Sequence, residues 1–292
     1  MKKTFKAFML VLMSASFLAF TSCTPKDEPT PVNPTPDNPT PVNPTPDNPT
    51  PDTPTSGDSW AYLINETPHE AVVNGNTLTY GDHSYTVSGE FDFNTPVSGQ
   101  LTQPTAFVTF TNIPSGYTEF EAVYNNLLGK SIQGTAAMIP MAMEIYARNA
   151  DLGERCFKLI CNSDATVAGI VRILKTKFNY SPYSPENDTY VQRYLPAVTL
   201  KGAAWDNGYN PTEPYTMEMC RHANDPQPTT SSGNGTDYFI YILVDPDHGG
   251  WDTFQRGVEI WQPMGSDMYK VWNCPNMYVQ CKPIYGTWRG LK

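Results

Sequence analysis

The sequence contains few basic residues. Only 19 of its 292 residues are Lys or Arg, against 29 Asp and Glu, which gives a formal net charge of −10 at pH 7. Proteins that bind nucleic acids neutralise phosphates with clustered Lys and Arg, so this balance argues against a nucleic-acid partner. Charged residues make up 16% of the chain and aromatic residues 12%. Because a fully disordered chain has the opposite composition, part of the sequence is expected to fold around a core.

Common catalytic motifs are also absent. The sequence has no G-x-S-x-G, H-E-x-x-H or phosphate-binding loop, and its cysteines are not spaced as zinc ligands. Cys220 and His222 could form a nucleophile–base pair, but a cysteine in a strand is usually a buried core residue. Five of the 29 acidic residues precede Gly57, and among the remaining 24 some pair will match glycosidase spacing by chance. The sequence therefore identifies no catalytic residue and favours a non-enzymatic role.

Long hydrophobic runs are scarce, and the main one is N-terminal. Residues 7–20 are mostly apolar and follow three lysines; 14 residues are too few for a comfortable membrane span but suit a signal peptide. The motif Phe20-Thr21-Ser22-Cys23 comes next and resembles a bacterial lipobox, with phenylalanine in place of the usual leucine. We expect residues 1–22 to be a lipoprotein signal peptide and Cys23 to be lipidated. An ordinary secretory signal is the alternative.

A short charged motif follows the cysteine. Lys26, Asp27 and Glu28 resemble the surface-export signal of Bacteroidota lipoproteins. This resemblance implies a protein that is lipid-anchored in the outer membrane and faces the cell exterior. Several acyl chains on one N-terminus hold a protein on a membrane far more firmly than one chain does.

A proline-rich spacer, residues 23–57 including the lipidated cysteine, separates this anchor from the rest. Twelve of the 28 prolines lie between Pro25 and Pro54, and the decapeptide PVNPTPDNPT occupies both 31–40 and 41–50. Proline favours extended, polyproline-II-like backbone, so we expect no packed structure here. At ~3.1 Å per residue this spacer could reach roughly 100 Å.

The remaining residues are enough for a sizeable core. After four lysines and five acids are subtracted, Gly57–Lys292 keeps 15 basic and 24 acidic residues, a net charge of −9. Residues 58–112 read as an N-terminal β region, with turns predicted at Asn74-Gly75 and Gly81-Asp82.

The spacing of apolar residues then changes from the alternation of a strand to the period of a helix. Apolar residues recur at helical spacing over 118–128 and 166–178. Residues 134–149 are apolar nearly all round, which predicts a buried helix. Pro140 lies in this segment and is expected to kink or restart the helix. Strand patterns return after Pro182; the candidates are Ala197–Lys201, Tyr215–Arg221, Tyr238–Val244, Gly257–Trp261 and Met268–Cys274. A block of helices (about 118–178) between two blocks of largely antiparallel strands predicts an α+β fold.

Several motifs also carry a family resemblance. They are Phe110-Thr111-Asn112-Ile113-Pro114, Gly134-Thr135-Ala136-Ala137, the segment 205–215, and Gly249-Gly250-Trp251-Asp252 with Arg256. Together they resemble an uncharacterised domain of secreted proteins and lipoproteins from gut Firmicutes and Bacteroidota, and Pro140 departs from its pattern. The resemblance supports an α+β domain of unknown function at 113–292 and implies no activity.

One Gly-rich loop could bind a metal. Asp245, Asp247 and Asp252 lie within eight residues beside His248, and calcium prefers such oxygen ligands. The loop does not match the EF-hand pattern, because the closing glutamate is missing. A polar turn between two strands is the alternative, and no other cofactor is predicted.

Aromatic residues indicate a binding surface. They are frequent after residue 200, as Trp205, Tyr209, Tyr215, Trp251, Trp261, Trp272 and Trp288. Trp205, Asp206, Asn207 and Tyr209 combine rings, an amide and a carboxylate in one loop. We predict that these four residues and Trp251 contact a ligand, with core packing as the alternative.

Five cysteines follow Cys23, an odd number that leaves at least one thiol in a monomer. Cys156 and Cys161 are expected to face the core. Cys274 and Cys281 flank a Pro-Asn turn, and this pair is our first candidate for a disulfide in an exported protein.

These observations favour a surface-displayed lipoprotein whose extracellular domain binds a glycan or a partner protein. An extracellular hydrolase acting on polymers and a structural component of the envelope are the alternatives. Display on a long spacer, and not an identified site, carries this expectation.

Overall fold

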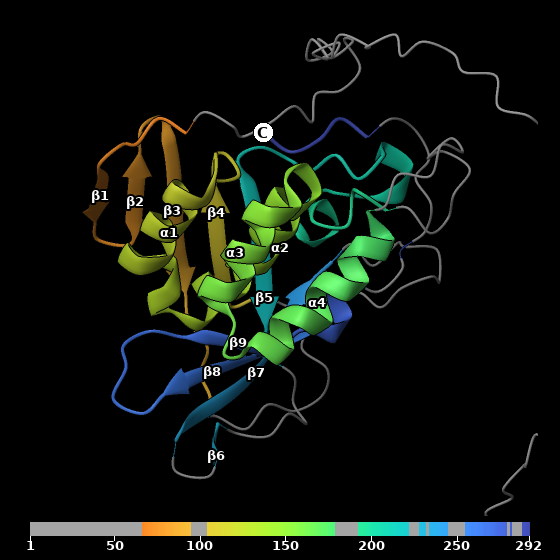
Figure 1. The fold of residues 1–292 in the computed structure, drawn as a ribbon. Helices are drawn as coiled ribbons and strands as arrows, with labels where there is room; N and C mark the ends of the chain where they lie inside the picture. Colours follow the sequence, from red (N-terminus) through yellow and green to blue (C-terminus); the bar gives the residue numbers. More distant parts are fainter. Residues whose placement is uncertain are drawn as a thin grey trace, which may run out of the picture. The chain divides into compact units, whose positions relative to one another are not determined.

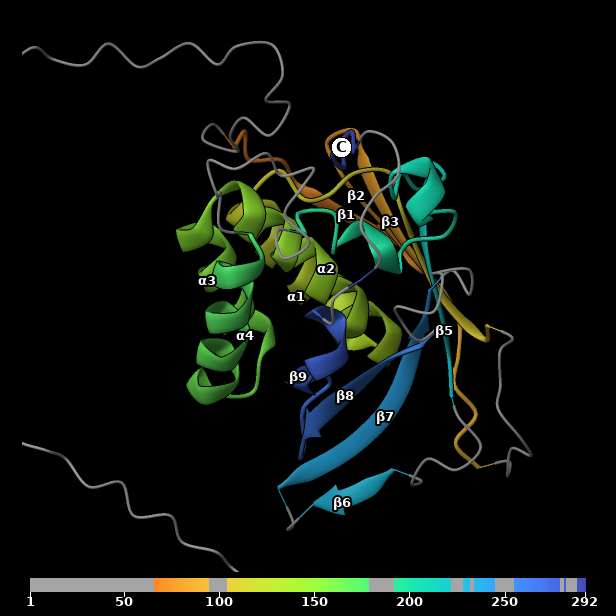
Figure 2. The ribbon, with the colours of Figure 1, turned by 90° about the vertical axis from the view of Figure 1, so that its right-hand side faces the viewer.

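The computed structural model describes residues 66–94, 104–178, 192–221, 228–231, 234–244, 255–278, 281 and 288–292. All of them belong to one unit, Thr53–Lys292. Helices pack against one face of a curved antiparallel sheet (Figures 1 and 2). The predicted α+β class is confirmed, with the helices in mid-chain between two blocks of strands.

The described sheet has nine strands, and every neighbouring pair is antiparallel. Their order is β1-β2-β3-β4-β5-β7-β8-β9, with β6 paired to β7. The bounds are β1 Ala71–Asn74, β2 Thr77–Tyr80, β3 His83–Gly89, β4 Ala106–Phe110, β5 Tyr215–Cys220, β6 Thr229–Ser231, β7 Gly235–Leu243, β8 Gln255–Pro263 and β9 Lys270–Asn273. Because β4 pairs with both β3 and β5, the N-terminal strands share one sheet with the later ones.

Two glycines set the first two hairpins. Gly75 and Gly81 each occupy the first position of a two-residue loop, with φ of 59° and 60°. This left-handed backbone is accessible to glycine at little cost, and it matches the twist of the flanking strands. Both predicted turns are confirmed.

Four helices fill the predicted helical block. They are α1 (Tyr117–Asn126), α2 (Ile132–Arg148), α3 (Ala150–Ile160) and α4 (Asp164–Lys177). The side chains of Ser131, Asn149 and Ser163 cap the last three by accepting hydrogen bonds from backbone N–H groups in the first turn. At the start of each of these three helices, a backbone N–H group that lacks a partner within the helix is therefore hydrogen-bonded.

The central helix is α2, which is buried from Ile132 to Tyr146. Pro140 lies inside this single helix, so the predicted restart does not occur. Proline has no N–H to donate to the carbonyl four residues earlier, and tertiary packing of α2 against α3 and the sheet outweighs that loss.

One predicted strand is wrong. Residues Ala197–Thr199 form a 3₁₀ helix, in which the Leu200 N–H donates to the carbonyl of Ala197 at 2.8 Å. Pro196 precedes it with φ −60° and ψ −39°, which are helical values. The proline therefore starts a turn where the apolar, β-branched composition had indicated a strand.

The sheet has two arms that meet at a short junction. Among the described residues, β5 pairs with β7 through two residue pairs, Met219 with Ile242 and Cys220 with Tyr241. Beyond this junction β7, β8 and β9 run in a different direction from β1–β5 (Figure 1). Helix α2 contacts β4 on one arm and β8 and β9 on the other, so the sheet curves around it.

Candidate functional site

The outer face of the β7–β9 arm carries aromatic and acidic side chains together. Ile240 and Ile242 in β7 and Val258 and Ile260 in β8 are fully buried on the helix side. Strand side chains alternate, so the residues between them lie on the opposite face. That face, here the aromatic–acidic face, is formed by Asp237, Phe239, Glu259, Trp261, Trp272 and Asn273.

Two tryptophans form the apolar part of this face. The rings of Trp261 and Trp272 lie 5.8 Å apart between centroids at an interplanar angle of 58°. An irregularity in the β8–β9 pairing lies between Glu259 and Ile260, and it brings Trp272 toward Trp261. The side chain of Trp272 is 42% exposed. A large ring in this position is available for stacking against a ligand.

Strand β9 is held in place from the helix side. The Lys270 ammonium donates to the carbonyl of Leu159, in the last turn of α3, where a cation also interacts favourably with the helix dipole. The N–H of Asn162 donates to the carbonyl of Val271 at 3.0 Å. The Thr166 hydroxyl donates to the carbonyl of Trp272 at 3.4 Å. The backbone that carries Trp272 is therefore fixed before any ligand arrives.

Two carboxylates lie beside the tryptophans. Asp237 is opposite Trp261 in the strand register, and Glu259 is opposite Phe239. Partial burial and the neighbouring Asp237 charge raise the pKa of Glu259, and a hydrogen bond from Asn273 acts in the other direction. One carboxylate oxygen of Asp237, Oδ1, is buried without a hydrogen-bond partner among the described residues. An acceptor left in this state favours a ligand that donates a hydrogen bond to it.

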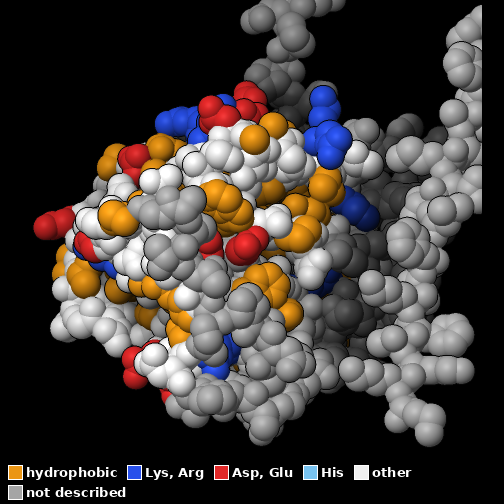
Figure 3. Space-filling view, turned by 90° about the horizontal axis from the view of Figure 1, so that it is seen from below, with side chains coloured by type: hydrophobic (Ala, Val, Ile, Leu, Met, Phe, Trp, Pro, Cys, Tyr) orange, Lys and Arg blue, Asp and Glu red, His pale blue; other side chains and the backbone are white. Residues whose placement is uncertain are grey.

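This combination of groups suits a carbohydrate. The C–H faces of a sugar ring stack on aromatic rings, and its hydroxyls donate hydrogen bonds to carboxylates and accept them from amides. The view from below Figure 1 shows hydrophobic side chains in several groups with acidic side chains among them (Figure 3). The aromatic–acidic face is the outer side of strands β7–β9, so it would bind a ligand that lies along the strands.

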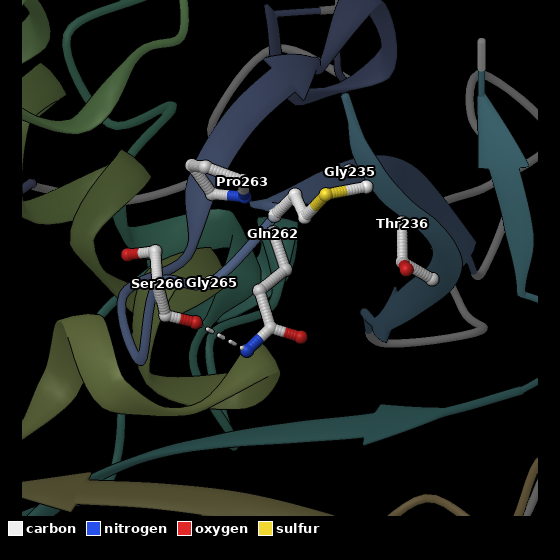
Figure 4. Close-up of a pocket in the computed structure, with 7 residues that line it drawn as sticks. Gly235, Thr236, Gln262, Pro263, Gly265 and Ser266 are labelled. Atoms are coloured by element: carbon white, nitrogen blue, oxygen red, sulfur yellow. Dashed lines mark hydrogen bonds between the residues drawn. The ribbon is translucent and has the colours of Figure 1, made fainter. Parts of the chain in front are cut away.

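A hollow of about 240 Å³ lies at the adjoining tips of β7 and β8 (Figure 4). Its lining includes Gly235, Thr236, Gln262, Pro263, Gly265 and Ser266. The Gln262 side-chain amide donates to the carbonyl of Ser266 at 3.0 Å and closes the β8–β9 turn. The described lining of this hollow has no titratable group, so it offers no residue for acid–base chemistry.

Hydrogen bonds of the Asn207 side chain hold the 205–209 loop in its conformation. The Asn207 side chain accepts hydrogen bonds from the N–H groups of Ala204 and Asn210 and donates to the carbonyl of Gly202. Tyr209 is completely buried, has φ 54°, and stacks on Tyr194 at 4.7 Å between ring centroids. Its ring therefore has no exposed face for a ligand, and Tyr209 is a core residue.

The other members of that loop differ from Tyr209. Trp205 is half-buried and packs against the core, whereas Asp206 and Asn207 are exposed. The loop thus has no exposed stacked pair of rings. Trp251, the calcium candidates Asp245, Asp247 and Asp252, and the N-terminal residues Cys23, Lys26, Asp27 and Glu28 lie outside the described residues.

The five cysteines after Cys23 are all buried, as expected for Cys156 and Cys161. Cys274 and Cys281 do not form the predicted disulfide, and no disulfide joins any of the five cysteines after Cys23. Cys274 follows β9 and its thiol lies near Cys161, while the Cys281 sulfur lies 3.8 Å from the Arg256 guanidinium. Burial raises the pKa of Cys161 to about 12, so this thiol stays protonated and unreactive.

No group of three His, Cys, Asp or Glu side chains is arranged to hold a metal ion within the described ranges. Within the same ranges, no helix combines the length and the apolar character of a transmembrane span.

Comparison with known proteins identifies one family. The model described as "Domain of unknown function (DUF6935)" matches residues 112–285, more than half of the chain. No curated protein and no solved structure matches the chain. The matched segment includes β5–β9 and therefore the whole aromatic–acidic face.

Proposed function

This chain belongs to the DUF6935 family, whose function is unknown, and on that premise we propose that it is a lipid-anchored extracellular protein that binds a carbohydrate through the aromatic–acidic face. The observation that carries the proposal is the pair Trp261 and Trp272 beside Asp237, whose buried oxygen lacks a partner among the described residues. The face combines stacking surface with hydrogen-bond acceptors on a rigid strand scaffold.

Features of the N-terminus support the location. The lipobox-like motif ending at Cys23, the charged residues Lys26-Asp27-Glu28 and the proline-rich spacer fit a Bacteroidota lipoprotein displayed on the outer membrane. A displayed protein meets polysaccharides outside the cell. An open surface, in contrast to an enclosed pocket, suits a polymer chain that extends beyond the site.

Binding is tested with a glycan array of the full chain, followed by titration of each hit. Trp272→Ala should weaken binding by about tenfold or more, because it removes the exposed ring of the site. Asp237→Asn should also weaken it, since only the ionised carboxylate accepts through both oxygens. Val72→Ala is the control, because Val72 is 53% exposed and lies on β1, at the opposite end of the strand order from β9. Absence of glycan binding, or equal binding by all variants, would refute the proposal.

The anchor is tested separately. Cys23→Ala should move the protein from the membrane fraction to the soluble fraction, because the cysteine is the proposed acylation site. Fractionation followed by immunoblotting measures this. Continued membrane retention of the variant would contradict lipidation at Cys23 and leave the carbohydrate proposal to its own test.

A further inference from the structure

A second pocket lies at the β2–β3 hairpin, on the other arm of the sheet. Its volume is about 200 Å³, and its lining includes Tyr80, His83, Ser115 and Glu119. His69 also lines it, so the pocket contains two of the four histidines of the chain. No sequence motif singled out these residues, since they come from β2, β3, the start of α1 and the segment before β1.

Glu119 is a buried carboxylate with a full set of donors. It is 1% exposed and accepts hydrogen bonds from the Tyr85 hydroxyl at 2.7 Å and from the Ser115 N–H and hydroxyl at 2.6 and 2.7 Å. Burial and the adjacent Glu119 raise the pKa of Tyr85 well above its ordinary value, so this phenol remains a donor. These hydrogen bonds hold the Glu119 carboxyl group in one position.

Glu119 also orients His83. The Nδ1 atom of His83 lies 2.7 Å from Oε1 of Glu119. With Nδ1 as the donor to this oxygen, the lone pair of the His83 ring lies on Nε2. The nearest described charged atom to Nε2 is Oδ1 of Asp82 at 3.8 Å, too far for a hydrogen bond, and Asp82 is 99% exposed.

Tyr80 lines the same pocket, and its hydroxyl is a donor that the pocket could use. Tyr80 and His83 are direct cross-strand partners beside the two-residue turn, so their side chains share one face. Tyr80 is 3% exposed, and its hydroxyl is buried without a hydrogen-bond partner among the described residues. The ring of His69 packs edge-on against the Tyr80 ring at 5.5 Å. A buried donor without a partner points to a ligand that accepts a hydrogen bond.

We propose that this pocket hydrolyses small acyl esters, with His83 as general base, Glu119 as its positioning residue and Tyr80 as a donor to the carbonyl oxygen. Nε2 of His83 takes a proton from a water molecule while the water oxygen attacks the acyl carbon. The carbonyl oxygen becomes an oxyanion and receives the Tyr80 hydrogen bond. The bond to the alcohol oxygen then breaks, and the proton on Nε2 passes to that oxygen, which gives one acid and one alcohol.

The geometry favours esters over other bonds. Glycoside hydrolysis needs two available carboxylates, and both oxygens of Glu119 are already bonded to donors. Ser115 donates to Glu119 and does not bond to Nε2 of His83, so a serine nucleophile is not activated. A pocket of about 200 Å³ accommodates a short acyl group such as acetyl. This activity is independent of the carbohydrate proposal.

The full-length protein in detergent is assayed with 4-nitrophenyl acetate. We expect saturable hydrolysis, with His83→Ala lowering kcat by about 100-fold. Added imidazole should restore part of that rate, because it occupies the space left by the side chain and supplies the missing base. Glu119→Gln should lower kcat more than it changes KM. Glu121→Gln is the control; this carboxylate is on the same helix and accepts from Tyr117 at 3.0 Å.

Tyr80→Phe keeps the test decisive if His83→Ala does not fold, because it removes a single oxygen atom. It should lower kcat by about 100-fold, as loss of one oxyanion donor does. The proposal is overturned if the wild-type rate rises without saturation and equals that of His83→Ala. Loss of activity in folded His83→Ala without recovery in imidazole, or an unchanged rate in Tyr80→Phe, also overturns it.

Discussion

Replacement of Gly89 by alanine should lower the free energy of unfolding by about 3 kcal/mol. Gly89 ends β3 with φ 66°, a left-handed backbone that costs alanine roughly 1–2 kcal/mol. A Cβ atom at this position would lie 2.1 Å from the carbonyl oxygen of Thr105. That oxygen is backbone, and it accepts from the N–H of Glu90, so it cannot rotate away as a side chain can.

Gly75→Ala is the matched control for this effect. Gly75 has a similar positive φ of 59°, and nothing lies within 4 Å of a Cβ built on it. Gly75→Ala should therefore show the backbone cost alone, roughly 1–2 kcal/mol. Urea unfolding followed by circular dichroism measures both variants. An equal decrease in the free energy of unfolding of both variants would contradict the prediction, because it would show that the close approach to Thr105 does not contribute to the cost at Gly89.

Arg148→Met should also be strongly destabilising, by about 3 kcal/mol or more. Glu144 is completely buried in α2, and Arg148 donates to it at 2.8 Å. The same guanidinium donates to the carbonyl of Leu291 at 2.6 Å. Removal of Arg148 leaves a buried carboxylate without its hydrogen-bonded partner. Lys158→Met is the control, because the exposed pair of Lys158 and Glu154 has the same spacing and should leave stability nearly unchanged.

The pH dependence provides a second readout of Glu144. Burial raises its pKa above the ordinary value of 4.5, and Arg148 and Arg193 only partly oppose this shift. The folded state therefore binds the Glu144 proton more tightly than the unfolded state does. This contribution is fully present below pH 4.5 and is lost as pH rises through the raised pKa. Glu144→Gln has no carboxyl group at this position and should not lose this stability. The free energy of unfolding of wild type should therefore fall relative to that of Glu144→Gln as pH rises. A difference between the two proteins that stays constant with pH would contradict this prediction.

Local signals predicted most of the secondary structure. Glycine-containing turns located the first hairpins, and the pattern of apolar residues located α1, α2 and α4. The error at Ala197–Thr199 has a local cause as well, because β-branched residues favour a strand whereas the preceding Pro196 starts a turn. Patterns within about ten residues were sufficient for these elements.

The candidate sites depend on contacts that no local pattern contains. Trp261 and Trp272 belong to an aromatic-rich part of the sequence, but their contact depends on the irregular register between β8 and β9. Asp237 joins them only through the β7–β8 pairing. His83 and Glu119 are 36 residues apart and meet because α1 packs beside β2. Alternation in β7 and β8 could have indicated Asp237 and Glu259 as outward-facing residues.

The narrow junction between β5 and β7 affects how the two proposed sites can influence each other. Among the described residues, two residue pairs of β5 and β7 connect the arms. Helix α2 contacts both arms and is a second physical link between them. In terms of allosteric coupling, an ester in the His83 pocket and a glycan on the aromatic–acidic face could influence each other through the β5–β7 junction and through α2.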